Sequence, residues 1–142
     1  MNFKDFTKID MPEKNGVQYL KFFDNGYGVS VIKHNFSYGS SDGLWELAIL
    51  EGNEKEHKIV YDTPIADDVI GWLDEDEVIE LADKVSKLRS VTDTKFYAIA
   101  ISSYEAIEDL GPYDSIERTE LAIENYVIHG DDPYPRFKIV RK

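Results

Sequence analysis

The chain has 142 residues, carries 28 acidic against 16 basic residues for a formal net charge of −12, and contains no cysteine. This length fits one domain with a core of its own. The missing cysteines exclude a disulfide framework, a thiolate metal site and a cysteine nucleophile. The excess of acid argues against a protein that binds nucleic acid by neutralising phosphates, because that mode needs a basic surface.

The first half of the chain predicts an antiparallel meander of four strands. Residues 1–16 show only scattered apolar positions, and we expect an arm with little structure there. Asn25-Gly26 joins two apolar runs and favours the positive φ angles of a type I′ hairpin turn. The third run is apolar on both faces except at Glu46, so its strand should be central in the sheet. The expected strands cover residues 17–23, 27–33, 44–50 and 57–61.

The second half predicts two helices and two strands. One helix begins after Asp74, where Asp74 as N-cap and Glu77 three residues later form a capping box. The other follows Gly111-Pro112-Tyr113, with Asp114 as its N-cap and Glu117 at the third helical position. Strands are expected over residues 95–102 and 136–141, before and after this second helix.

The resulting order, ββββ-α-β-α-β, predicts the α+β class: an antiparallel sheet with both helices packed on one face. We expect residues 1–142 to form a single domain. A subdivision into a meander plus helix (1–90) and a strand–helix–strand unit (91–142) stays open.

Nearly all of the net charge lies in one segment. Residues 51–83 hold 12 acidic and 2 basic side chains, and the flanking parts of the chain are each close to neutral. The candidate binding surface, here called the acidic segment, consists of Asp62, Asp67, Asp68, Asp74, Glu75, Asp76 and Glu77.

Two interpretations of the acidic segment compete. As an imitation of a polyanion, the helix would carry six acids from Asp74 to Asp83, with Glu80 and Asp83 included, at about one charge per ~2.3 Å. This spacing lies between the ~1.7 Å of duplex and the ~3.4 Å of single-stranded nucleic acid. As an ordinary solvated face, its acids would favour the positive end of the helix dipole. The pairs Glu80–Lys84 and Asp83–Lys87, spaced i,i+4, would then neutralise the rest of the helix.

Aromatic residues supply a second candidate surface. The chain has nine Tyr, seven Phe and two Trp. Two connecting segments combine rings with small polar residues, a composition typical of adaptable recognition surfaces; their candidate binding residues are Phe36, Tyr38, Tyr104 and Tyr113. The alternative is that these rings fold back over the sheet edge. Trp45 and Trp72 are expected in the core.

Catalytic and metal-binding patterns are missing from the sequence. His34, His57 and His129 lie far apart and match no ligand spacing, and no nucleophile elbow or phosphate-binding loop occurs. We therefore expect a protein that is not an enzyme and needs no cofactor. Loop carboxylates at Asp62, Asp67 and Asp68 keep a Mg²⁺ or Ca²⁺ site open as an alternative.

A series of short segments, rather than one motif, carries a resemblance to a known group of proteins. The segments are FDNGYGVSVI (23–32), SYG (37–39), GLWELAIL (43–50) and YDTPIADDVIG (61–71). Through them, residues 17–89 resemble small uncharacterised proteins encoded by bacteriophages and prophages. The resemblance implies a protein made in the cytoplasm of an infected bacterium, with a role in the conflict between phage and host, and it transfers no catalytic residue.

Our leading hypothesis is a non-enzymatic phage accessory protein that binds a host or phage protein with a basic surface. The acidic segment and its neighbouring aromatics would occupy the basic groove of a nucleic-acid-binding defence or replication factor, without direct contact with nucleic acid or membrane. Two alternatives stay open: a carboxylate–metal enzyme or accessory factor, and a structural, virion-associated subunit. The sequence does not specify the oligomeric state.

Overall fold

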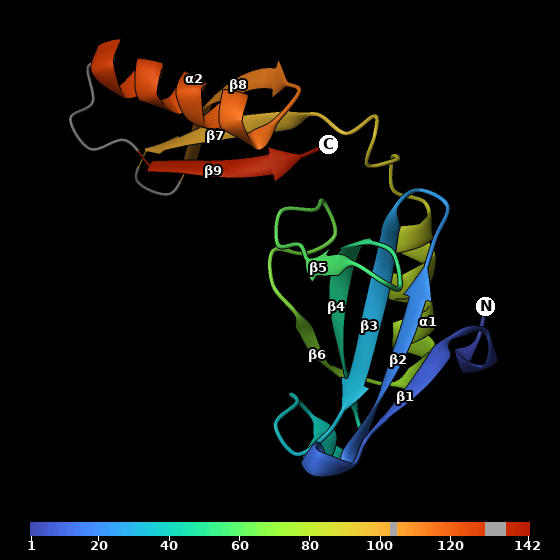
Figure 1. Ribbon diagram of the computed structural model, residues 1–142. Coiled ribbons are helices and arrows are strands. Elements are labelled where there is room, and N and C mark those ends of the chain that lie inside the picture. The colour runs from blue at the N-terminus through green and yellow to red at the C-terminus, as the bar shows by residue number, and fades with distance from the viewer. Residues whose placement is uncertain (103–104, 130–135) are drawn as a thin grey trace. The chain divides into compact units, whose positions relative to one another are not determined.

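The computed structural model describes residues 1–102, 105–129 and 136–142. Its chain divides into two compact units, shown in Figure 1. Unit 1 comprises residues 1–61 and 65–92, and unit 2 comprises residues 62–64 and 93–142. Each unit contains one antiparallel sheet and one α-helix.

The sheet of unit 1 is a meander in which strands adjacent in sequence pair antiparallel, as predicted. The fourth strand, β4, is central. It pairs with β3 on one side, and on its other side it pairs with β6 near its start and with β5 near its end. The strands are β1 (Thr7–Met11), β2 (Gly16–Phe22), β3 (Tyr27–Lys33), β4 (Trp45–Gly52), β5 (His57–Ile59) and β6 (Ile70–Leu73).

The expectation of an arm with little structure over residues 1–16 is wrong. β1 pairs with β2 from Thr7 opposite Leu20 to Met11 opposite Gly16. A short 3₁₀ turn at 12–14 reverses the chain, and Asn15 completes the turn with a left-handed φ of 52°. The strand was missed because β1 is exposed at the sheet edge and lacks the alternation of a half-buried strand.

The hairpin between β2 and β3 forms, but not with the expected type I′ turn. Gly26, with φ 84°, is left-handed, whereas Asn25 is not, and the Gly26 N–H donates to the carbonyl of Phe23 at 3.2 Å. The Asn25 amide instead donates to the carbonyls of Val85 and Leu88 at 2.9 and 3.0 Å. Asn25 therefore ties the hairpin to the end of the following helix.

Helix α1 (Glu75–Ser86) begins with the predicted capping box. The Asp74 carboxylate accepts the Glu77 N–H at 2.8 Å, and the Glu77 carboxylate accepts the Asp74 N–H at 3.2 Å. α1 packs on β3 and β4, and Figure 1 shows it running alongside them. The core of unit 1 lies between helix and sheet and includes Trp45, which confirms the expectation for that residue. Its buried members are Phe6, Tyr27, Val29, Val31, Trp45, Leu47, Ile49, Val60, Leu73, Val78, Ala82 and Val85.

Unit 2 holds three strands in the order β8-β7-β9 and helix α2 (Ile116–His129), which contacts all three strands. The strands are β7 (Phe96–Ser102), β8 (Glu105–Tyr113) and β9 (Arg136–Arg141). β8 was not predicted as a strand. The N-cap of α2 is Ser115 rather than Asp114, because the Ser115 hydroxyl accepts the Arg118 N–H at 3.2 Å.

The α+β class and the antiparallel arrangement of the strands are confirmed. The strands, expected in one sheet under two helices, lie in two sheets with one helix each. The unpredicted strand β8 accounts for the difference, since its pairing with β7 gives residues 93–142 a sheet of their own.

Candidate functional site: an exposed aromatic patch

The loop between β3 and β4 is fixed by two buried polar residues, His34 and Ser37. The Ser37 hydroxyl accepts the His34 N–H at 2.9 Å and donates to the His34 carbonyl at 3.0 Å. The Phe36 N–H donates to His34 Nδ1 at 3.0 Å. Phe36 itself is 79% exposed. Its ring is therefore presented to solvent by a loop with a defined structure.

Trp72 is the second element of the site, and its backbone is irregular. β4 and β6 pair through Trp45 opposite Leu73 and Leu47 opposite Ile70, so Gly71 and Trp72 together face the single residue between them on β4. Such a β-bulge bends the strand and re-aims a side chain. Trp72 has a left-handed φ of 55°, a conformation that costs a bulky side chain roughly 1–3 kcal/mol.

Two glycines let the loop and the bulge pack closely. A Cβ on Gly71 would lie 2.5 Å from the Cβ of Tyr38, and one on Gly39 would lie 2.9 Å from the Cα of Trp72. The Trp72 N–H donates to the Tyr38 carbonyl at 3.3 Å. The rings of Tyr38 and Trp72 lie 5.4 Å apart between centroids, and their side chains are 55% and 58% exposed.

We call Phe36, Tyr38 and Trp72 the aromatic patch. The expectation that Trp72 lies in the core is wrong: the bulge and the left-handed φ turn it outward. Of the other two candidate aromatics, Tyr113 is half-buried in β8 of unit 2. Tyr104 lies outside the described residues.

Six residues of the acidic segment belong to unit 1, and all six are exposed. Asp68 accepts its neighbour's N–H at 2.7 Å, and Asp74 and Glu77 form the capping box. The side chains of Glu75 and Asp76 make no hydrogen bond or ion pair within the described part of the chain. A carboxylate that accepts a backbone N–H keeps its charge, so the start of α1, directly after Trp72, stays negative.

Asp62 is separate from these six. It belongs to unit 2, where its carboxylate lies 2.8 Å from Nε of Arg141 and its carbonyl accepts the Arg141 N–H at 3.0 Å. The Arg141 side chain is 4% exposed, and its guanidinium lies 5.2 Å from the ring centroid of Phe96. The charge of Asp62 is thus compensated by a cation of the chain itself.

Further along α1 the acids are paired, as predicted. Lys84 lies 3.5 Å from Glu80 and Lys87 lies 2.8 Å from Asp83, both at i,i+4 spacing. Exposed pairs of this kind stabilise a helix by about 0.2–0.5 kcal/mol each. The uncompensated charge of α1 is therefore confined to its first turn, and the helix does not present a continuous anionic stripe.

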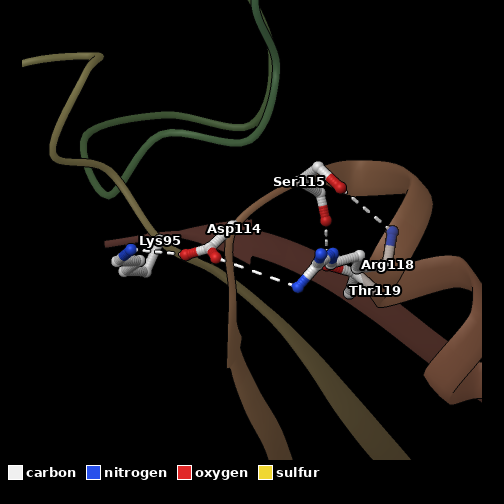
Figure 2. A network of polar contacts seen from close by, with 5 residues as sticks. All are labelled: Lys95, Asp114, Ser115, Arg118 and Thr119. Carbon is white, nitrogen blue, oxygen red and sulfur yellow. Dashed lines mark hydrogen bonds and ion pairs between the residues drawn. The ribbon is translucent and has the colours of Figure 1, made fainter.

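A separate polar network joins Lys95, the residue before β7, to the start of α2 (Figure 2). The Asp114 carboxylate lies 2.5 Å from the Lys95 ammonium and 4.0 Å from the Arg118 guanidinium. Ser115 caps the helix, and the Thr119 hydroxyl donates to its carbonyl at 2.8 Å. The hydrogen bond and charge of Lys95, helped by Arg118, lower the pKa of Asp114 below its usual value. These contacts have a structural role at the helix terminus.

Within the described residues, no three His, Asp or Glu side chains are grouped so as to hold a metal ion. His34 accepts the Phe36 N–H, and His57 Nδ1 lies 2.9 Å from the carbonyl of Asn53. The chemistry available at the aromatic patch is that of contact: apolar area, ring faces and nearby carboxylates.

Comparison with protein-family models, curated proteins and solved structures gave no match. None of the helices in the described part of the chain is long and apolar enough to cross a membrane. The site is therefore interpreted from its own geometry.

Proposed function

We propose that the protein is a non-enzymatic binding module whose aromatic patch contacts a partner protein with a cationic surface. The observation that carries the proposal is Trp72, which is 58% exposed on a bulged strand with a left-handed backbone. The partner is a protein of the phage or of the host bacterium, met in the bacterial cytoplasm, in line with the resemblance to phage-encoded proteins.

The stability of the fold does not explain this arrangement. An exposed indole contributes less burial than a core tryptophan, and its left-handed backbone adds a cost of roughly 1–3 kcal/mol. Strain of this kind concentrates at functional sites. Tryptophan and tyrosine are also the residues that most often dominate the binding energy of protein interfaces. Tyr38 and Trp72, held by the same hydrogen bond and glycine packing, form a preorganised anchor.

Charge complementarity selects the class of partner. Asp74, Glu75, Asp76 and Glu77 follow Trp72 within five residues, and none of the four forms an ion pair with a described residue. A lysine or arginine of the partner would contact both a carboxylate and the face of the indole, where cation–π attraction contributes about 0.5–2 kcal/mol. Binding in the basic groove of a nucleic-acid-binding protein would exclude its nucleic acid. The negative field also accelerates association at low salt.

Capture from a bacterial extract, quantified by mass spectrometry, compares the wild type with Trp72→Gly. Glycine keeps the left-handed backbone accessible and removes the indole. Leu121→Ala is the matched control, because Leu121 is 59% exposed on α2 in the other unit.

The proposal expects a protein that the wild type and Leu121→Ala retain equally and that Trp72→Gly loses by at least tenfold. The affinity of that protein should fall with rising salt, because the contact is partly electrostatic. Equal retention by the wild type and both variants, or an affinity that does not change with salt, would overturn the proposal.

A further inference from the structure

A hollow of about 410 Å³ lies in unit 1, behind the loop that carries Phe36 and Tyr38. It lies where the start of β2 meets the end of β3. Its volume is in the range of small-molecule sites. The polar residues that line it are Asn15, Lys33, His34, Asn35, Ser40 and Ser41.

His34 is the buried polar group of this hollow. The residue is only 8% exposed. Its Nδ1 accepts the Phe36 N–H, so in the neutral ring the proton sits on Nε2, which is a donor. Nε2 forms no hydrogen bond with a described residue, and it is not among the described side-chain atoms that are closed to solvent. It is therefore an unpaired donor that a ligand in the hollow can reach.

The composition of the lining points to a negatively charged ligand. None of the described residues that line the hollow is acidic, although acids make up 28 of the 142 residues of the chain. Lys33 supplies a positive charge, and its ammonium lies 4.0 Å from the ring centroid of Trp45. The side chains of Asn15, Asn35 and Ser40 form no hydrogen bond with a described residue.

We propose that this hollow binds the oxyanion group of a small ligand, a phosphate or a carboxylate. His34 Nε2–H is the central donor, and the Asn amides and Ser hydroxyls around it complete the contacts. Because Nδ1 stays bonded to the Phe36 N–H, the ligand would also fix the loop that presents Phe36. This site does not depend on the partner protein. Either proposal, that for the hollow or that for the aromatic patch, can therefore be contradicted without affecting the other.

NMR titration of the full chain tests this site at constant pH and ionic strength. The probes are inorganic phosphate in one arm and acetate in the other, with chloride as the reference salt. The readouts are the ¹⁵N resonance of His34 Nε2 and the amides of residues 33–41. His34→Asn is the informative variant, because its side-chain oxygen replaces Nδ1 as acceptor while the Nε2 donor is lost. His57→Asn, at an exposed histidine of β5, is the matched control.

The proposal expects saturable shifts at His34 and the loop amides with at least one probe, and the arm that responds identifies the oxyanion. The dissociation constant should rise at least tenfold in His34→Asn and stay unchanged in His57→Asn. Ser40→Ala with Ser41→Ala, which leaves His34 in place, should raise it at least threefold. Shifts that do not saturate in either arm, or an unchanged constant in both hollow variants, would overturn the proposal.

Discussion

Asp114 shows how individual side chains of this acidic protein are stabilised at its surface. Its carboxylate accepts a hydrogen bond from Lys95 and lies within reach of Arg118, and these two cations favour its charged form. A carboxyl group whose pKa is lower in the folded state than in the unfolded state stabilises the fold at every pH above its unfolded pKa. That contribution is lost as the pH falls through the folded pKa.

We therefore predict that Asp114 titrates below the usual range of aspartate in the wild type. Lys95→Met should raise its pKa, because the hydrogen bond and the nearest charge disappear together. Arg118→Gln should raise it less, because that contact is 4.0 Å long. Carboxyl ¹³C shifts followed by NMR between pH 2 and 7 measure these values, and an equal effect of the two variants would contradict the assignment.

Asp62 and Arg141 form the most buried ion pair described, and its loss should be costly. Arg141→Met leaves Asp62 without its cation, and breaking a buried pair in this way typically costs about 3–5 kcal/mol. Since the Asp62 side chain is 20% exposed, we expect a loss of stability at the lower end of this range. Hydrogen exchange should show the loss of protection in β7 and β9, and Asp62→Asn combined with Arg141→Met should recover part of it. Loss confined to unit 1 would contradict this placement.

Among the elements, α1 and β6 contrast in how far sequence specifies structure. Asp74 and Glu77 begin α1 as predicted, because a capping box depends only on local spacing. β6 was missed since it has four residues and its bulge is defined by the distant strand β4. The outward turn of Trp72 follows from that pairing, which residue type alone does not reveal. Gly71 next to Trp72 was the available clue, since glycine inside a strand pattern suggests a bulge.

The capping box separates the structural role of Asp74 from its charge. Asp74→Ala should lower the free energy of unfolding by about 1 kcal/mol, because the Glu77 N–H loses its acceptor. Asp74→Ser should lose little stability, since serine is an equally good N-cap. Urea unfolding gives both values, and equal losses in the two variants would contradict the role of the cap. Partner binding should weaken in both, because both lack the carboxylate.

For the whole molecule, composition and periodicity predicted the class and the meander, and they left the division into two units open, as a possible subdivision into residues 1–90 and 91–142 of a single domain. The central position of β4 could be predicted because its residues are apolar on both faces. The second sheet was not predicted, because residues 105–113 show no clear alternation and were not recognised as a strand that pairs with β7. The sequence also shows directly that most of the net charge lies in residues 51–83. However, the fold assigns Asp62 to a different unit from the other six acids.

The central claim of this account is that unit 1 holds Trp72 outward for a partner rather than for its own stability. The most direct measurement is the free energy of unfolding of Trp72→Gly and Trp72→Ala beside the wild type. We predict a loss below about 2 kcal/mol for glycine, with glycine about 1 kcal/mol more stable than alanine because the backbone is left-handed. A loss of about 3–5 kcal/mol, as for a core tryptophan, or alanine more stable than glycine, would contradict the claim.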